Sequence, residues 1–385
     1  MKIISIVGAR PNFMKIAPFI RAIENYNKVN GIKIEHVLVH TGQHYDIRMS
    51  QQFFAELNIP PADIHLEIGS GTHAEQVGKT MIEFEKVVRT EKPEWVVVVG
   101  DVNAICAGSI VAKKEHIKLA HIEAGLRSGD ITMPEEVNRL VADRLSDLLL
   151  TPDRISNANL EKEGVPDEKI KFVGNIMIDT LENEREKATK LNTSEIIKEN
   201  LLTKRTTILQ IENDKYAVVT LHRPSNVDQK EILSHLVDFL SDEVTKDIPV
   251  LWPVHPRTQK NLNEFGLIEK LFANPNMILL HPLGYHSMLK LNMHARVVLT
   301  DSGGLQEECT VLGTPCLTLR WNTERPITLK EHGGASVLVG NNIERIREEY
   351  QKTLTFVRTP VNPELWDGRT AERIITEIIN ASNFS

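Results

Sequence analysis

Cysteine is scarce in this 385-residue sequence, and its scarcity argues against two kinds of stabilising site. The three cysteines, Cys106, Cys309 and Cys316, form no C-x-x-C pair. A disulfide scaffold or a zinc site needs paired or regularly spaced cysteines, so we expect neither. The sequence also lacks an H-E-x-x-H or paired-aspartate pattern, and we therefore predict no metal. This use of cysteine is typical of a reduced, cytoplasmic protein.

Long apolar runs and a strong charge of one sign are lacking too. The first apolar run, residues 1–8, is too short for a signal-peptide core or a membrane span. We interpret it as a β-strand and expect no membrane partner. The 45 basic and 52 acidic residues give a net charge of −7, which argues against a nucleic-acid partner. Any anionic ligand must therefore be held by a local site.

Short apolar segments alternate with segments of helical period along nearly the whole sequence. This pattern predicts an α/β fold with two Rossmann-like, doubly wound domains, because buried parallel strands are nearly continuous apolar runs. The expected strands of the first half are residues 2–8, 35–40, 64–68, 95–99, 119–122, 148–150 and 171–173. Those of the second half are residues 216–221, 250–254, 277–280, 297–300, 316–319 and 336–339.

Two domains are expected from the length of the chain and from its two sets of strands. We place the first domain at residues 1–177 and the second at 178–365, and we interpret segment 192–207 as the crossing into the second domain. The helix expected within 366–385 returns to complete the first domain. Ligands of open α/β sheets bind at the carboxyl ends of the strands, so we predict a cleft between facing domains.

The most informative stretch joins the expected strand 297–300 to a helix through the turn 301–304, which reads Asp-Ser-Gly-Gly. Such a turn places free backbone N–H groups and the positive end of a helix at the tip of a strand, where a phosphate binds well. Ser302 can cap the helix or add a hydroxyl to the phosphate. Glu307 and Glu308, expected in the first turn of this helix, suit a sugar hydroxyl. A capped turn without a ligand is the alternative.

A second anion-binding turn is expected after the first strand. Arg10 stands in the turn 8–12, and Lys15 lies near the start of the following helix. Two cations at the carboxyl end of a strand can clamp an anion. A structural arginine and a solvated lysine are the alternative interpretation.

Segment 69–74 (Gly-Ser-Gly-Thr-His-Ala) formally matches the G-x-G-x-x-A fingerprint of dinucleotide binding. It does not follow the first strand of the domain, and the acid of the next strand, Asp101, comes later than the fingerprint requires. We therefore interpret the segment as a loop and expect no cofactor.

Three carboxylates are expected to meet at one edge of the first sheet. Asp101 and Glu123 each end an apolar strand, and Glu135 opens a nearby helix. Like charges held together away from bulk water separate their pKa values, so one acid can hold a proton while another accepts one. A helix cap or a solvated loop acid is the alternative for each. His222, at a strand end, is a further catalytic or phosphate-binding candidate, and His255 has weaker support.

These motifs together resemble the non-hydrolysing UDP-N-acetylglucosamine 2-epimerases, in order and over nearly the whole chain. In the first half the resemblance rests on residues 8–11 with Lys15, and on 41–44, 100–101, 121–127 and 134–139. In the second half it rests on residues 222–223, 300–308 and 323–326. After residue 223 the sequence reads Pro-Ser-Asn, where bacterial members often have an acid before the asparagine. The resemblance implies the GT-B arrangement, a UDP-sugar in the cleft and a homodimer.

The resemblance also implies roles for individual residues. Acid/base and catalytic roles fall on Lys15, Asp101, Glu123, Glu135 and His222. Places near the diphosphate or its sugar fall on Arg10, Arg139, Ser302, Gly303 and Gly304. Glu308 is implied at the ribose hydroxyls, and Tyr285 falls where the family has a residue near the uracil.

The implied reaction is reversible epimerisation of UDP-N-acetylglucosamine to UDP-N-acetylmannosamine at C2, a carbon whose hydrogen is not acidic. One route oxidises C3 with NAD; the other eliminates UDP to a 2-acetamidoglucal and adds it back. Elimination needs cations and N–H groups at the diphosphate and carboxylates around C1 and C2, which this sequence offers. A hydrolysing epimerase, a GT-B UDP-sugar glycosyltransferase and a non-catalytic UDP-sugar sensor are the alternatives.

Overall fold

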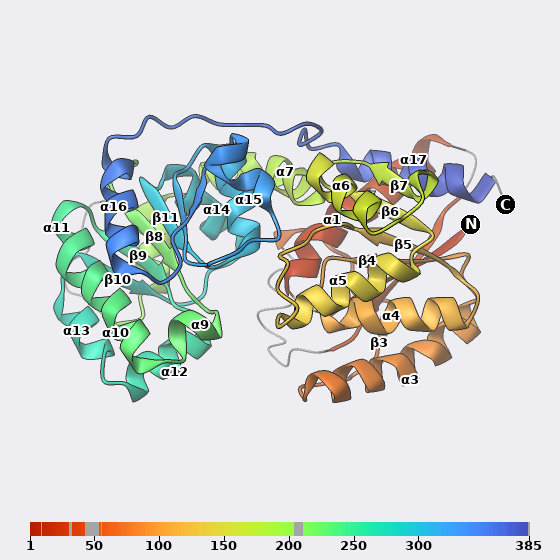
Figure 1. The fold of residues 1–385 in the computed structure, drawn as a ribbon, viewed down its shortest axis with the longest axis horizontal. Coiled ribbons are helices and arrows are strands. Elements are labelled where there is room, and N and C mark those ends of the chain that lie inside the picture. Colours follow the sequence, from red (N-terminus) through yellow and green to blue (C-terminus); the bar gives the residue numbers. More distant parts are fainter. Residues whose placement is uncertain (9, 31–32, 43–53, 55, 204–210, 384–385) are drawn as a thin grey trace. The chain divides into compact units, whose positions relative to one another are not determined.

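The computed structural model describes residues 1–8, 10–30, 33–42, 54, 56–203 and 211–383, and only the backbone of residues 10 and 11. The chain forms two compact units. Unit 1 comprises Met1–Asn183 and Pro363–Ser385, and unit 2 comprises Glu184–Asn362. Unit 1 is therefore discontinuous in sequence, and the dark-blue C-terminal helix belongs with the red-to-yellow part of the chain (Figure 1).

Unit 1 is built on a seven-stranded parallel sheet with the order β3-β2-β1-β4-β5-β6-β7 (Figure 1). The strands are β1 Lys2–Val7, β2 Glu35–His40, β3 Ile64–His65, β4 Trp95–Val99, β5 Lys118–Ile122, β6 Leu148–Thr151 and β7 Ile170–Phe172. All five residues of β4 are buried, as expected for a central strand with helices on both faces. The strand order reverses between β1 and β4, which is the point where α/β sheets bind ligands.

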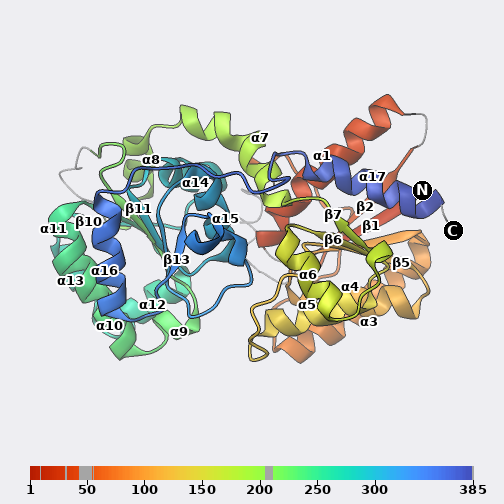
Figure 2. The same cartoon turned by 45° about the horizontal axis from the view of Figure 1, so that its top comes forward.

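Helices cover the sheet of unit 1, and the last of them comes from the C-terminal end of the chain. They are α1 Arg10–Val29, α3 His73–Glu91, α4 Asn103–Lys114, α5 Pro134–Leu145, α6 Arg154–Lys162, the 3₁₀ turn η1 Asp167–Lys169, and α17 Thr370–Asn383. Helix α17 lies beside α1 in both views (Figures 1 and 2). The Asp179 carboxylate accepts hydrogen bonds from the first amides of α17, Thr370 N at 2.9 Å and Ala371 N at 2.7 Å. These bonds fix the start of α17 on unit 1.

Unit 2 repeats the architecture with a six-stranded parallel sheet of order β10-β9-β8-β11-β12-β13. The strands are β8 Ala217–Thr220, β9 Val250–Pro253, β10 Met277–Leu280, β11 Val297–Thr300, β12 Cys316–Thr318 and β13 Ser336–Leu338. Its order reverses between β8 and β11. The α/β class predicted from the sequence is therefore confirmed, with two parallel sheets.

The helices of unit 2 include several short segments. They are α8 Thr193–Asn200, α9 Pro224–Val227, α10 Lys230–Phe239, the π-helical η2 Leu240–Val244, α11 Thr245–Asp247, α12 Pro256–Glu264, α13 Ile268–Ala273, α14 Tyr285–His294, α15 Gly303–Leu312, the 3₁₀ turns η3 Pro326–Thr328 and η4 Lys330–His332, and α16 Ile343–Leu354. None of the described helices in either unit is long and apolar enough to cross a membrane.

The first passage between units lies inside a helix, α7 (Ile176–Lys190), at Asn183–Glu184. The expected crossing at 192–207 is wrong for its described part, because that part belongs to unit 2. Helix α8 buries Ile196 and Ile197 in the core of unit 2. The charge-rich composition that suggested a connection instead reflects the solvent-facing sides of α7 and α8.

Candidate active site

Lys15 and Glu123 form a buried ion pair at the carboxyl edge of the unit 1 sheet. Lys15 lies in the second turn of α1, which follows β1, and Glu123 directly follows β5. The ammonium Nζ pairs with Oε2 of Glu123, and both side chains are almost fully buried. Asn12 braces the turn before Lys15: its Oδ1 accepts from Gly8 N at 3.0 Å and its Nδ2 donates to Val99 O at 2.8 Å. A buried pair of this kind persists because each charge compensates the other.

Gly100 makes room for this pair. Its φ of +77° is a left-handed conformation that favours glycine. A Cβ at this position would lie 3.0 Å from Lys15 Nζ and 3.6 Å from Glu123 Oε2. The glycine after β4 is thus required by both the backbone conformation and the space that the pair occupies.

Asp101 is held by Arg139. Arg139 is buried on α5, and its Nη1 donates to Asp101 Oδ2 at 2.6 Å. The same guanidinium binds Glu136 Oε2 through Nη2 at 2.5 Å and Nε at 3.2 Å. Burial alone would raise the pKa of Glu136, but Arg139 and the amides of Ser128 and Gly129 lower it below its usual range. Arg139 therefore bridges a fixed structural carboxylate and Asp101, whose side chain stays 22% exposed.

Glu135 lies in the first turn of α5 and is half-buried. It forms no hydrogen bond or ion pair with another described residue, so its carboxylate is not committed to a structural contact. The structure thus brings Lys15, Glu123, Asp101 and Arg139 together at one edge and puts Glu135 on the helix that carries Arg139. The side chain of Arg10, at the start of α1, lies outside the described part of the chain, as do Gln43 and His44.

In unit 2, His222 and Asp301 meet where β8 and β11 end. His222 Nδ1 lies 2.9 Å from Oδ1 of the fully buried Asp301. The same carboxylate accepts hydrogen bonds from Arg223 N at 2.9 Å and from Asn226 Nδ2 at 3.0 Å. Burial would raise the pKa of Asp301, but these donors, His222 first, lower it to about 2. Asp301 is thus ionised near neutral pH, and Nδ1 of His222 is the donor.

The predicted phosphate-binding turn begins α15. Ser302 occupies the N-cap position, but its hydroxyl caps no described backbone amide. A Cβ on Gly303 would lie 2.7 Å from Arg325 Nη1 and 2.8 Å from Glu324 Oε1, so the turn fits closely over these two side chains. The first-turn amides and the helix dipole of α15 can therefore act on an anion. Gly304 continues the same turn.

A buried ionic network supports this turn. Arg325 pairs with Glu307 through Nε at 2.8 Å and with Glu324 through Nη1. Arg320 Nη2 donates to Glu324 Oε2 at 2.6 Å. Glu307 is thus engaged by Arg325 inside the protein, and the interpretation of Glu307 as a carboxylate placed for a sugar hydroxyl is wrong.

Glu308 differs from Glu307 because its described partners are neutral. Asn292 Nδ2 donates to Glu308 Oε2 at 3.2 Å. Burial raises the pKa of Glu308 to about 7, although Asn292 and Tyr285 act in the opposite direction. Tyr285 is the first residue of α14 and is itself buried. The structure thereby brings Glu308 and Tyr285, the two residues predicted for the nucleoside, to one place.

Two weaker candidates have local structural roles. The turn 69–74 closes with a capping box: Thr72 Oγ1 accepts from Glu75 N at 3.3 Å, and Glu75 Oε2 accepts from Thr72 N at 2.8 Å. A carboxylate at this helix start would repel a pyrophosphate, which supports the interpretation as a loop. His255 caps α12 by accepting from Arg257 N at 3.2 Å, with its ring 5.6 Å from that of His222.

The comparisons with known proteins agree with this geometry. A family model described as UDP-N-acetylglucosamine 2-epimerase matches residues 27–379. The chain belongs to this family. A UDP-N-acetylglucosamine 2-epimerase of Methanocaldococcus jannaschii is 42% identical to it over 97% of this chain and 98% of the relative.

Solved structures of the family share the fold. The crystal structure of the Methanocaldococcus jannaschii UDP-GlcNAc 2-epimerase, in complex with UDP-GlcNAc and UDP, matches with a TM-score of 0.87 at 41% identity. The match covers 99% of this chain and 100% of that one. One relative is named for a different substrate. This UDP-2,3-diacetamido-2,3-dideoxy-D-glucuronate 2-epimerase of Pseudomonas aeruginosa is 38% identical over 92% of each chain.

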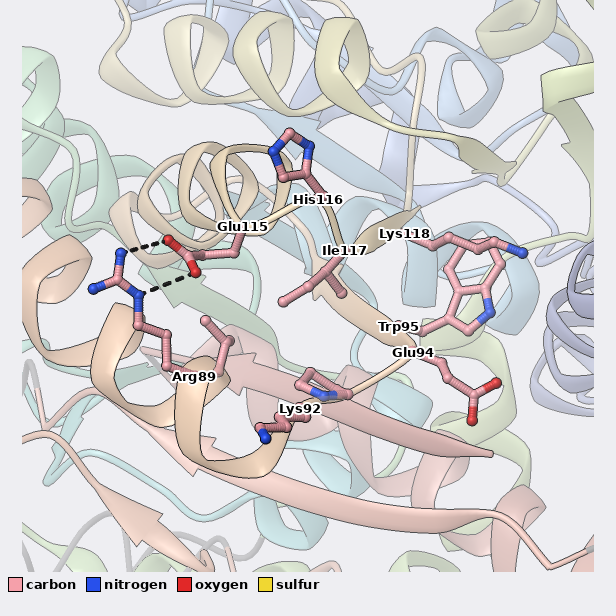
Figure 3. Close-up of a pocket in the computed structure, with 10 residues that line it drawn as sticks. Arg89, Lys92, Glu94, Trp95, Glu115, His116, Ile117 and Lys118 are labelled. Carbon is pink, nitrogen blue, oxygen red and sulfur yellow. Dashed lines mark hydrogen bonds and ion pairs between the residues drawn. The ribbon is translucent and has the colours of Figure 1, made fainter. Parts of the chain in front are cut away.

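A pocket of about 520 Å³ lies at the other edge of the unit 1 sheet, where β4 and β5 begin (Figure 3). Arg89 donates to Glu115 there at 3.1 and 2.8 Å, and Lys118 Nζ lies 5.5 Å from the centre of the Trp95 ring. None of the predicted epimerase residues lines this pocket. The described residues of the family motifs that carry site roles lie at the carboxyl edges instead.

Asp301 is a candidate functional residue to which sequence reasoning gave no role. The signal was available, because Asp301 follows the apolar strand 297–300 as Asp101 follows 95–99. Glu136, quoted only as part of a motif, was missed in the same way, and its link to Arg139 needed the helical spacing of three residues.

Proposed function

We propose that this protein catalyses the reversible C2 epimerisation of UDP-N-acetylglucosamine to UDP-N-acetylmannosamine without hydrolysis. The observation that carries the proposal is the cluster at the carboxyl edge of unit 1, where the Lys15–Glu123 pair adjoins Asp101 held by Arg139. A protein that only bound a UDP-sugar would have no need for these buried charges. Their desolvation is unfavourable, so they are retained most readily where chemistry uses them.

The nucleotide is assigned to unit 2. The amides of Ser302, Gly303 and Gly304 and the dipole of α15 would bind the diphosphate, with Arg10 as a further cation. Glu308 would accept hydrogen bonds from the ribose hydroxyls, and Tyr285 would lie near the uracil. These assignments are supported by the glycine turn at the start of α15 and by the position of Glu308, whose described hydrogen-bond partner Asn292 is neutral.

The sugar is assigned to the carboxylates of unit 1. As the C1–O bond breaks, its electron pair leaves with UDP, and the positive charge developing at C1 makes the C2 proton acidic. One carboxylate among Asp101, Glu123 and Glu135 takes that proton, and a C1=C2 double bond forms. A phosphate oxygen of the retained UDP then adds to C1, while a different acid delivers a proton to the other face of C2.

His222 and Lys15 complete the proposed catalytic set. With Nδ1 of His222 donating to Asp301, its Nε2 has no partner among the described residues; in the imidazolium form of the ring Nε2 also carries a proton and would donate to the leaving phosphate. Lys15 would hold Glu123 in place beside the reacting carbons. The charges proposed to act on the substrate therefore depend on two ion pairs, Lys15–Glu123 and His222–Asp301.

Proton NMR of UDP-N-acetylglucosamine incubated with the protein in D₂O, without added NAD or metal, tests the proposal. UDP-N-acetylmannosamine should appear, with deuterium at C2 of both epimers. Release of free N-acetylmannosamine and UDP would identify a hydrolysing epimerase instead. No change in the spectrum, with UDP still bound, would reject epimerisation and favour a transferase or a sensor.

Substitution of the carboxylates tests the mechanism separately. Asp101→Asn, Glu123→Gln and Glu135→Gln should each lower turnover by more than about tenfold, the contribution expected of a positioned acid or base. If each variant kept turnover within about tenfold of the wild type, the two-carboxylate mechanism would be wrong.

The identity of the substrate needs its own comparison because of the Pseudomonas aeruginosa relative. UDP-2,3-diacetamido-2,3-dideoxy-D-glucuronate should be assayed beside UDP-N-acetylglucosamine. A higher kcat/KM for the glucuronate would replace the proposed substrate and keep the chemistry at C2.

We infer from the resemblance that the enzyme is a homodimer serving polysaccharide biosynthesis in the cytoplasm. The three free, buried cysteines are compatible with a reducing compartment. Light scattering of the purified protein, with an expected mass of twice 43.5 kDa, tests the dimer.

A further inference from the structure

His121, which lies on β5 two residues before Glu123, is completely buried and bonded at both ring nitrogens. Its Nε2 lies 2.8 Å from the carbonyl oxygen of Gly100, and its Nδ1 lies 2.6 Å from Oδ1 of Asp143. A carbonyl oxygen only accepts, so Nε2 is a donor. Asp143, fully buried on α5, is ionised, because His121 and Arg127 outweigh the effect of burial and hold its pKa below the usual range. Nδ1 is then a donor as well, as in an imidazolium ring.

The second oxygen of Asp143 holds the turn after β5. Oδ2 accepts from Gly125 N at 3.0 Å and from Arg127 Nη1 at 2.7 Å. The other side of the Arg127 guanidinium pairs with Glu163, at 2.7 Å from both Nε and Nη2. The buried His121–Asp143 pair thus links three segments: the residue after β4, the turn after β5, and helix α5, which carries Asp143.

Each of these three segments carries one of the proposed catalytic carboxylates. Gly100 directly precedes Asp101, Gly125 lies two residues after Glu123, and Glu135 is on the same helix as Asp143. Glu123 has a φ of +71°, a conformation that residues with a side chain rarely adopt and that surrounding bonds must hold. Asp143 supplies one of those bonds through Gly125 N, and Leu150 O supplies another by accepting from Glu123 N at 3.0 Å.

We propose that His121 and Asp143 are positioning residues of the epimerase reaction, which fix Asp101, Glu123 and Glu135 relative to one another. The proposal rests on the proposed function. Stability alone explains the pair poorly, because apolar residues of similar volume fill a core without the desolvation of two charges. Apolar residues would not, however, bond to Gly100 O and Gly125 N at the same time. The pair acts through backbone atoms and does not contact the sugar.

The experiment compares His121→Gln, Asp143→Asn and the double variant with Asp147→Asn as a matched control. Asp147 follows α5, accepts a hydrogen bond from the β5 amide Leu119 N at 2.9 Å and pairs with Lys113 at 2.8 Å. It therefore makes bonds of the same kind as Asp143, but at the opposite end of β5. Asp147→Asn therefore shows how turnover responds when bonds between α5 and β5 are weakened but the bonds near the three carboxylates are kept.

Each single variant of the pair should lower kcat for the UDP-sugar by about 100-fold, the effect of a misplacement on the order of 1 Å, with KM and the Kd of UDP within about threefold. The double variant should fall no further than the worse single variant by more than about threefold, because the two residues act as one unit. A kcat within about threefold of wild type in both singles would overturn the proposal. So would an equal loss in Asp147→Asn.

Amide hydrogen exchange gives a readout that does not need turnover. In Asp143→Asn, exchange at Glu123 N and Gly125 N should speed up by about tenfold or more, and in Asp147→Asn it should not. If the wild type fails to epimerise the UDP-sugar, the proposed function fails, and exchange alone then decides the positioning claim. Unchanged exchange at both amides in Asp143→Asn would overturn it.

Discussion

His222 donates a hydrogen bond from Nδ1 to Oδ1 of Asp301 across 2.9 Å, and this contact joins the ends of two adjacent strands of unit 2. Because the carboxylate is ionised and also bonded to Arg223 N, the orientation of the imidazole and the identity of its donor nitrogen are both fixed. A histidine held this way presents Nε2 in one direction. The same residue without Asp301 would choose between two tautomers and several rotamers.

Asp301→Asn should therefore lower turnover by about 10- to 100-fold, in line with the loss of a group that orients a functional histidine. The Kd of UDP should change much less, since the glycine turn remains. Steady-state kinetics and titration calorimetry measure the two effects. Asp228→Asn is the control, because Asp228 pairs with Arg257 at the surface of the same unit. Equal kinetics for Asp301→Asn and wild type would show that His222 needs no orienting carboxylate.

Gly100→Ala should impair turnover by about tenfold or more, because the added methyl group enters the space beside the Lys15–Glu123 pair. Gly164→Ala is a matched control in the same unit, with a φ of +76° and no neighbouring atom near the added Cβ. Both variants incur the backbone strain of about 1 kcal/mol or more, and only Gly100→Ala displaces the pair. If the two variants had similar kcat values, the space that the added methyl group occupies at Gly100 would not be what determines turnover.

Glu308 makes the stability of the protein depend on pH. Its pKa is about 7 in the folded protein against an ordinary value of 4.5 for glutamate, so the folded state binds its proton more tightly. The resulting stability is fully present below pH 4.5 and is lost as the pH rises through 7, by about 3 kcal/mol in total. Glu308→Gln lacks this titrating carboxyl group, and with it this dependence of stability on pH. Urea unfolding should thus show that the free energy of unfolding of Glu308→Gln rises relative to that of the wild type between pH 5 and pH 8. A difference that stays constant over this range would contradict the prediction.

Glu308 should also make nucleotide binding depend on pH. Ribose hydroxyls that donate to the carboxylate favour its ionised form, so UDP should bind more tightly as the pH rises through about 7. Between pH 8 and pH 6 the Kd should rise by about tenfold at most. The phosphate of UDP titrates as well, and the Glu308→Gln variant serves as the reference because it retains that titration. Parallel pH profiles of wild type and variant would exclude Glu308 as the ribose contact.

The sequence predicted the strands well because apolar runs of four or five residues mark central parallel strands directly. Residues 95–99, 277–280 and 297–300 were placed with the bounds that the structure has. The strand expected at 64–68 is only Ile64–His65, because Glu67 takes a φ of +54° and leaves the ladder. A conformation of that kind has no signal in hydrophobic pattern.

The partners of the site residues were harder to predict than their positions. Lys15 and Glu123 are separated by 108 residues, so only the sheet order reveals that they meet. The crossing inside α7 was missed for a related reason: its helical pattern continues through residues 183 and 184 without a break. Local sequence indicates helical period well, but it does not indicate whether a given turn of the helix packs against the hydrophobic core of unit 1 or of unit 2.

The return of the chain to unit 1 has a consequence for synthesis on the ribosome. The chain leaves unit 1 at residue 183, builds all of unit 2, and re-enters unit 1 only at residue 363. All of unit 2 is therefore synthesised before the segment that supplies α17. Until that segment emerges, the Asp179 carboxylate has no helix start to cap, and Pro152 O lacks the hydrogen bond from Trp366 Nε1. The first unit to appear is thus the last to be completed.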